Sequence, residues 1–157
     1  MAMDCTIRKS TPEDEREILE CLKTAFLPYR EDYSELAFLD TVLTPETYRA
    51  RLSEMCILVA AGDGGHVMGT IAYKAADDEG HIRGMAVVPE QQGSGLAERL
   101  LKRAETELCA AGCTAVTLDT TRPLQRAIRF YERNGFRATG EVTPFFGMEL
   151  LAYRKEL

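Results

Sequence analysis

The fold of this chain is decided by the stretch GMAVVPEQQGSGLAERLLKRA, residues 84–104, in which an apolar run gives way to a glycine loop and then to helical spacing. Pro89 ends the apolar run, because proline cannot donate a hydrogen bond to a sheet. Gly93 and Gly95 follow. Beyond them, apolar residues recur every three or four positions and predict one helix face made of Leu96, Leu100, Leu101, Ala104 and Leu108. The stretch therefore predicts a strand, a tight loop and an amphipathic helix.

The start of that helix is a candidate anion site. The first amides of a helix have no acceptor within it, and the helix dipole adds partial positive charge, so a phosphate is favoured there. Two familiar phosphate loops do not fit: Glu98 stands where a dinucleotide fingerprint has its third glycine, and no Gly-Lys-Ser/Thr ending of a P-loop follows. The alternative is an ordinary turn that needs glycine for its φ angles.

Before this stretch the sequence predicts an antiparallel meander. Apolar runs at 57–61 and 66–76 flank Gly-Asp-Gly-Gly, a strong hairpin signal, and a second turn at 77–80 leads into a strand at 81–88. After the helix comes a strand at 113–119. A strand, a helix and a strand in succession form a crossover, which makes the two strands parallel.

The other predicted elements are shorter. The sequence Ser-Thr-Pro-Glu at 10–13 predicts a capping box before a helix that ends near Phe26. Two short helices are expected within 27–55, with these apolar stripes: Leu36, Leu39 and Leu43, then Tyr48, Leu52 and Met55. Further expected elements are a strand at 5–9, a helix at 124–134, and strands at 136–142 and 146–155.

Together these elements predict an α+β fold, a three-layer α/β/α arrangement around a mixed, mostly antiparallel sheet. The length of 157 residues and the hydrophobic content of 45% suit one domain spanning residues 1–157.

Composition excludes several classes of function. A formal net charge of −6 repels nucleic acid and anionic membranes, so we expect neither as a partner. No long apolar segment and no signal peptide are apparent, which favours a cytoplasmic protein. The five cysteines are scattered, without a Cys-x-x-Cys pair or a nearby histidine, so we expect no metal site.

Three motifs together resemble a known superfamily. QGSGLA fits the pattern Q-x-x-G-x-A with Gln92, Gly95 and Ala97; the strand GMAVVPE precedes it, and AIRFYERNGF follows some thirty residues later. Over essentially the whole chain the sequence resembles the GNAT superfamily of acyl-CoA-dependent N-acetyltransferases. The resemblance implies direct transfer of acetyl from acetyl-CoA, the co-substrate, to a primary amine in a ternary complex.

The resemblance also implies how acetyl-CoA would bind. Backbone amides of six loop residues would hold the pyrophosphate: Gln92, Gly93, Ser94, Gly95, Leu96 and Ala97. The strand ending at Ala86, Val87 and Val88 would pair with the pantetheine arm, in a gap where the parallel strands splay apart.

Two residues are candidates for proton transfer. Tyr131 stands where many family members carry a tyrosine that protonates the CoA sulfur, although it also continues an apolar helix stripe and so could be a core tyrosine. Many relatives have a glutamate base where this chain has Arg83. His81, two residues earlier on the same strand face, is a candidate base. A water chain, or an amine that arrives already deprotonated, is the alternative.

The acceptor is less constrained by the motifs. Tyr29, Arg83 and Phe145 are the candidate substrate-binding residues, and the amine can belong to a small molecule or a protein. A homodimer is a further expectation, because dimers are common among proteins that resemble this one. A non-catalytic acyl-CoA sensor or partner-binding subunit is the rival reading, because Arg83 and Leu124 stand where relatives have polar functional residues.

Overall fold

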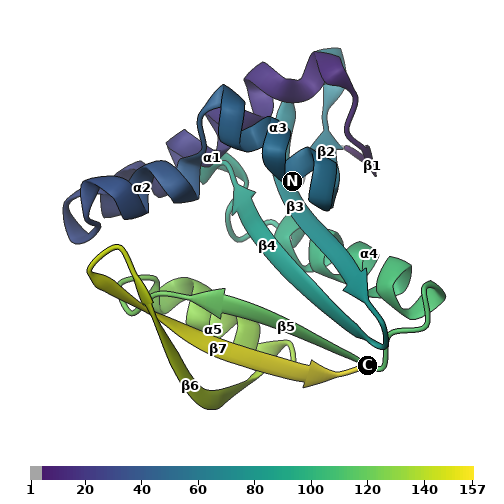
Figure 1. Ribbon diagram of the computed structural model, residues 1–157. Helices are drawn as coiled ribbons and strands as arrows, with labels where there is room; N and C mark the ends of the chain where they lie inside the picture. The colour runs from purple at the N-terminus through teal and green to yellow at the C-terminus, as the bar shows by residue number, and fades with distance from the viewer. Residues whose placement is uncertain (1–4) are drawn as a thin grey trace.

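The computed structural model describes residues 5–157, which form a seven-stranded sheet in the order β1-β2-β3-β4-β5-β7-β6 (Figure 1). The strands are β1 (Thr6–Lys9), β2 (Cys56–Ala61), β3 (Val67–Ala76), β4 (Glu79–Val87), β5 (Ala115–Thr120), β6 (Arg137–Phe145) and β7 (Met148–Glu156). Within the described residues, β4 and β5 are the only parallel neighbours; the other pairs are antiparallel. This confirms the predicted mixed sheet.

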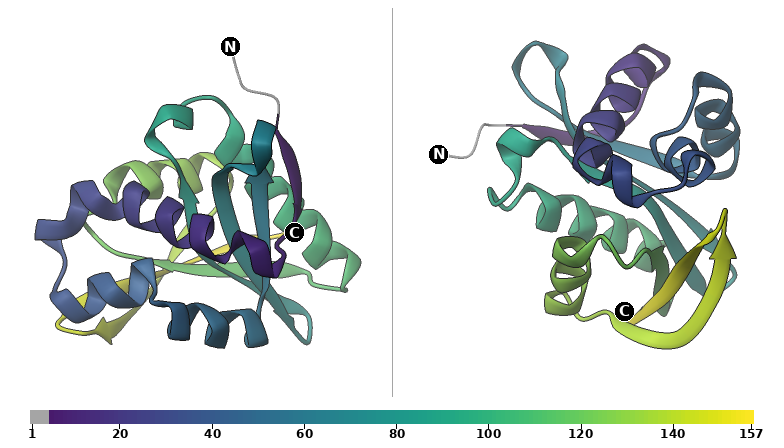
Figure 2. Two further views of the ribbon diagram at one scale, coloured as in Figure 1. Left: turned by 90° about the horizontal axis from the view of Figure 1, so that it is seen from above. Right: turned by 90° about the vertical axis from the view of Figure 1, so that its left-hand side faces the viewer.

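Helices cover both faces of the sheet, which gives the predicted three layers (Figures 1 and 2). They are α1 (Glu15–Phe26), α2 (Glu35–Val42), α3 (Pro45–Glu54), α4 (Leu96–Ala110) and α5 (Gln125–Arg133). Helix α1 packs on β3 and β4, while α4 packs on the other face of β2, β3 and β4. The predicted stripe of α4 is confirmed: Leu96, Leu100, Leu101, Ala104 and Leu108 are all buried.

The capping box before the first helix lies one residue later than predicted: it joins Thr11 to Asp14 instead of Ser10 to Glu13. Thr11 is the cap of a short 3₁₀ turn (Pro12–Asp14), and its backbone amide donates to the Asp14 carboxylate at 2.7 Å. Asp14, not Glu13, accepts the capping hydrogen bond, because Arg8 from β1 also donates to the Asp14 carboxylate at 2.7 Å. The partner from another element therefore selects the capping residue.

The predicted apolar stripes of α2 and α3 are confirmed only in part: Leu43, Tyr48 and Met55 are buried, whereas Leu36, Leu39 and Leu52 are exposed. On α2 the buried residues are Ala37, Phe38 and Val42, whereas Leu36 and Leu39 are 60% and 43% exposed. On α3 the buried residues are Tyr48 and Arg51, while Leu52 is 41% exposed. In such short helices several stripes are compatible with the sequence, and packing against α1 and the sheet chooses among them.

The last hairpin is also tighter than predicted. Strand β6 continues to Phe145, and only Phe146 and Gly147 form the turn before Met148. Both turn residues have positive φ, 51° and 83°, as a two-residue hairpin matched to the strand twist requires. The turn geometry therefore keeps Phe145 in the strand.

The parallel strands β4 and β5 separate halfway along β4. Their register runs from Glu79 opposite Ala115 to Ile82 opposite Leu118 and stops there. Beyond that point the two strands diverge into a V, visible in Figure 1, with its closed end near the β3–β4 turn. A bulge in the β3–β4 register, between Thr70 and Ala72, bends β4 at the same level.

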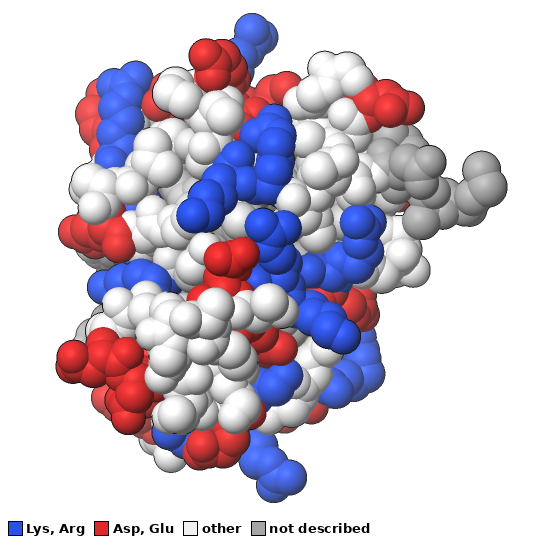
Figure 3. Space-filling view, turned by 90° about the vertical axis from the view of Figure 1, so that its right-hand side faces the viewer, with Lys and Arg blue, Asp and Glu red and all other residues white. Residues whose placement is uncertain are grey.

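No helix within residues 5–157 is long and apolar enough to cross a bilayer. The face seen in Figure 3 carries both signs of charge: a band of Lys and Arg crosses its middle, with Asp and Glu mostly toward its edges.

Candidate functional site

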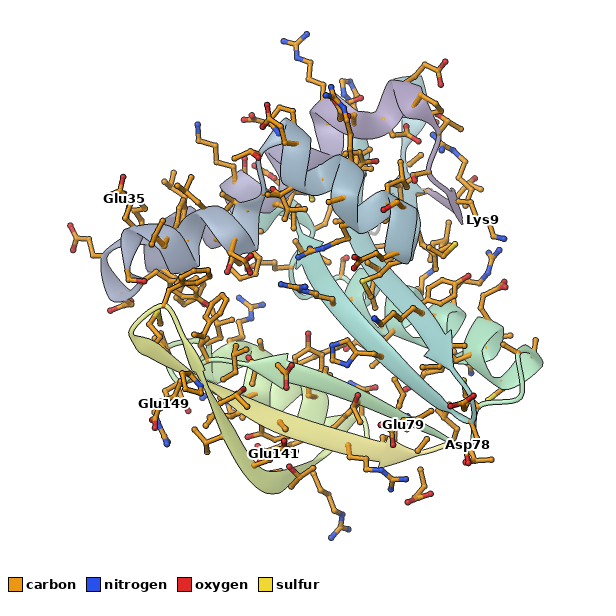
Figure 4. All side chains as sticks on the ribbon, viewed as in Figure 1. Lys9, Glu35, Asp78, Glu79, Glu141 and Glu149 are labelled. Atoms are coloured by element: carbon orange, nitrogen blue, oxygen red, sulfur yellow. The ribbon has the colours of Figure 1, made fainter. Side chains whose placement is uncertain are left out.

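A cavity of about 660 Å³ occupies the V-shaped gap. The open end lies between α1 and α2 on one side and α5 and the β6–β7 hairpin on the other, as the right-hand view of Figure 2 shows. Figure 4 shows side chains from both arms pointing into the gap, while the labelled Asp78 and Glu79 mark the closed end. A cavity of this size accommodates a drug-sized ligand.

Most of the sequence-predicted site residues line this one cavity. They are Tyr29, His81, Arg83, Ala86, Val87, Gln92, Gly93, Gly95, Ala97, Tyr131 and Phe145. Three others do not. Leu96 is buried in the core, Val88 donates its amide to the Met68 carbonyl oxygen, and the Ser94 hydroxyl donates to the Gln91 carbonyl oxygen.

The glycine loop leaves backbone amides free. Gly93 and Gly95 have φ of 83° and 89°, a conformation that favours glycine, and an added Cβ at either position would meet open space. The turn therefore does require glycine for its φ angles. Among residues 5–157, no acceptor faces the amides of Gly95, Leu96 and Ala97. These donors stand at the positive end of the α4 dipole.

A free strand edge leads from this loop into the gap. On its other side β4 pairs with β3. Toward β5, its residues 83–87 have no strand partner in the part of the chain that the structure describes. The Val87 carbonyl oxygen accepts from Gln92 Nε2 at 3.1 Å, and Arg126 of α5 donates to Gln92 Oε1 at 3.1 Å. Gln92 thus ties the loop to both arms of the V.

Tyr131 reaches the gap from α5. Its hydroxyl donates to the Met85 sulfur on β4 at 3.7 Å, and its ring packs edge-on against Phe130 and Phe136. Burial raises the pKa of Tyr131 to about 12. The phenol is therefore protonated at neutral pH and can donate a hydrogen bond or a proton.

His81 lies on β4 in the last paired part of the V. Its Nδ1 is 2.8 Å from Thr117 Oγ1 on β5. Burial lowers the pKa of His81, and the positive charge of Arg83 lowers it further, while the carboxylate of Asp119 raises it. The net result is a pKa below the ordinary histidine value, so the ring is neutral at pH 7 and able to accept a proton.

Comparison with known families now identifies the fold. Residues 16–136 match the model of the Acetyltransferase (GNAT) family. The chain belongs to this family. The match spans the glycine loop, the free edge of β4 and Tyr131, so the family resemblance seen in the sequence is confirmed.

Individual relatives of this GNAT chain agree with the family assignment. It is 34% identical over 77 residues to the IAA acetyltransferase of Azospirillum brasilense. This alignment covers 49% of this chain and 50% of that protein. Over 58 residues it is 43% identical to an acetyltransferase of Agrobacterium fabrum, covering 36% of this chain and 41% of that one. The aligned stretches span about half the length of these curated relatives or less.

Solved structures share the fold of this GNAT chain. The PaiA N-acetyltransferase of Thermoplasma acidophilum, solved with coenzyme A, superposes with a TM-score of 0.83 over 99% of this chain and 100% of that one, at 22% identity. The ribosomal-protein-S18-alanine N-acetyltransferase of Escherichia coli gives 0.76 over 98% and 94%, at 17% identity.

The far end of the GNAT cavity is aromatic. Tyr29 and Phe145 both line it and pack on the cluster formed by Tyr33, Ala37, Phe38 and Val42. The Ser34 hydroxyl donates to the Phe146 carbonyl oxygen at 2.7 Å, which joins the start of α2 to the β6–β7 turn. Residues distant in sequence therefore form one end of the cavity.

Sequence reasoning missed Asp40 and Arg51, which also line the cavity. Arg83 Nη2 donates to Asp40 Oδ2 at 2.9 Å. A signal was present in the sequence, because Arg51 is three residues from Tyr48 and lies on the same helix face. An arginine on a buried face looks like an ordinary surface residue until the packing is known.

The described part of the chain contains no set of side chains arranged as metal ligands. No three His, Cys, Asp or Glu side chains come together there in a way that could hold an ion.

Proposed function

We propose that this chain transfers an acetyl group from acetyl-CoA to a primary amine by direct attack in a ternary complex. The observation that carries the proposal is the free edge of β4, because it connects the unpaired amides of the loop at Gly95 to the hydroxyl of Tyr131. Family membership supports acyl transfer, and a fold neighbour was solved with coenzyme A.

Each part of the site has a role in this proposal. The amides of Gly95, Leu96 and Ala97 would receive the pyrophosphate at the helix start. Open-edge backbone groups of β4 near Ala86 and Val87 would pair with the amides of the pantetheine arm, which would enter the gap as an added strand. The Val87 carbonyl oxygen, which accepts from Gln92, would not be among them. The thioester would then lie between β4 and Tyr131.

The reaction needs two proton movements. The amine must lose a proton before or during attack on the thioester carbonyl, and neutral His81 would accept it directly or through water. Collapse of the tetrahedral intermediate breaks the carbon–sulfur bond and expels the CoA thiolate. Tyr131 would donate to this sulfur; the burial that raises the phenol's pKa also disfavours a bare thiolate at the same place.

A thermal-shift series followed by a thiol-release assay tests this function. Acetyl-CoA should raise the midpoint of unfolding by several degrees, because a ligand at a hundred times its Kd stabilises by about 2.7 kcal/mol, while NAD and ATP should not. A suitable amine should then release free thiol. Binding without release from any amine would instead support the acyl-CoA sensor.

A further inference from the structure

An unpaired cation lies in the cavity. Arg51 is only 8% exposed, and the part of its side chain that remains accessible faces the cavity. Within residues 5–157 its guanidinium has no hydrogen-bond acceptor and no ion-pair partner. A nearly buried arginine without an anionic partner is unusual, because buried charges are normally paired. Its nitrogens are not fully buried, so their N–H groups are open to a ligand in the cavity.

The backbone of β4 is shaped to admit this side chain. Gly84 has φ of 61°, and a Cβ added there would lie 2.6 Å from Arg51 Nη1. The guanidinium therefore lies against the backbone at the level where β4 leaves β5. Burial, together with the charge of Arg83, lowers the pKa of Arg51 to about 10, so the side chain is still charged at neutral pH.

A second arginine stands beside it. Arg83 also lines the cavity and is paired with Asp40, whose negative charge acts on Arg51 as well. The two arginines and one aspartate carry a net charge of +1. A single negative charge would balance this group, and two guanidinium groups are suited to a carboxylate because their donors match its two oxygens. A phosphate dianion would leave an excess of negative charge.

The distance from the reaction centre limits the size of the ligand. His81 and Arg83 are alternate residues in a regular part of β4, opposite Lys74 and Ala72, so both side chains leave the same face. Residues two apart on a strand are separated by about 6.6 Å. An amine near His81 and an anion at Arg83 must then belong to a short molecule.

We propose that the acceptor is an α-amino acid whose carboxylate is bound by Arg51 and Arg83. This proposal rests on the proposed function, since it names the acceptor of that same site. The amine of the bound amino acid faces His81 and Asp119, and the side chain extends toward Tyr29 and Phe145. The carboxylate supplies the partner that Arg51 lacks within the protein.

Calorimetry on matched ligand pairs tests the carboxylate site by binding alone. The CoA-saturated protein is titrated with a panel of N-acetyl amino acids, the expected products, and with the corresponding N-acetyl amino acid amides, which differ only by lacking the negative charge. At least one acid should bind tenfold or more tightly than its amide. Equal affinities of acid and amide across the panel would overturn the proposal.

Variants on α3 and β4 test which residues cause the preference for the acid over the amide. Arg51→Gln and Arg83→Gln should each reduce the acid-to-amide ratio at least fivefold, while leaving the affinity for the amide nearly unchanged. Arg49→Gln is the matched control, because Arg49 is on the same helix but 64% exposed and paired with Glu15 outside the cavity. A preference that survives in both cavity variants would place the carboxylate elsewhere and refute the assignment.

Failure of the proposed function gives a different pattern. If CoA and acetyl-CoA produce no binding heat, acetyl transfer is refuted, and the acid and amide titrations are made on the protein without CoA. A preference for the acid that depends on Arg51 would still support the carboxylate site in that case. Its absence would reject that site too.

Discussion

His81 Nδ1 lies 2.8 Å from Thr117 Oγ1, in the last stretch where β4 and β5 remain paired. This contact occupies one ring nitrogen and fixes the orientation of the ring, so the other nitrogen is left for a substrate. In the proposed reaction, this positioned histidine takes the place of a carboxylate base at Arg83.

The acid limb of the pH profile should report His81. Because burial lowers its pKa, the ring is neutral above that pKa and loses its ability to accept a proton as the pH falls through it. We expect kcat/KM to fall at a pH below about 6.5, the ordinary histidine value. In His81→Gln this inflection should disappear and the plateau rate should drop. A variant profile that keeps the same inflection would remove His81 from the reaction.

Loss of the Tyr131 hydroxyl should act on turnover. Tyr131→Phe keeps the ring contacts with Phe130 and Phe136 but removes the donor, so kcat should fall about 10²-fold or more with acetyl-CoA affinity nearly intact. Tyr153→Phe, in a buried core position, is the control and should retain activity. Unchanged turnover in Tyr131→Phe would contradict the proposed donor.

The glycine loop can be tested with a matched pair of variants. Gly95 and Gly112 flank the two ends of α4, have φ of 89° and 93°, and both face open space. Alanine at either position should cost roughly 1 kcal/mol of stability through the same backbone strain. Only Gly95→Ala should also weaken acetyl-CoA binding, by about tenfold, because Gly95 lines the cavity and Gly112 does not. Equal affinity of the two variants by calorimetry would argue against a pyrophosphate site.

Asp14 should make the fold sensitive to acid. The hydrogen bond from Arg8, followed by the Thr11 amide and the charge of Arg8, holds the pKa of this buried carboxyl below its usual value. Its contribution is therefore complete above about pH 4, the unfolded value, and is lost as the pH falls through the lower folded value.

Denaturation of Asp14→Asn measures that contribution. At pH 7 the variant should be about 1–2 kcal/mol less stable than the wild type, and the difference should shrink toward pH 3. Glu13→Gln alters the exposed neighbour and should change stability little. A difference that stays constant with pH would mean that packing, rather than the charge of Asp14, is responsible.

The sequence by itself determined the elements that depend on local patterns. The apolar spacing of α4 was sufficient to place its five buried residues, because a 15-residue helix with a single apolar stripe can pack in one way. The glycine loop was equally clear, since few residues other than glycine adopt its φ angles. The three family motifs then linked these elements to one fold.

Only the tertiary structure brought together the charged residues of the cavity. Arg51, Asp40 and Arg83 come from α3, α2 and β4. They meet because the Arg51 side chain lies against Gly84 and Arg83 pairs with Asp40. The stripes of α2 and α3 were predicted only in part for the same reason: in short helices the partner surface selects the buried face. The electrostatic environment of a buried charge depends on residues distant in sequence, and these come near it only when the chain has folded.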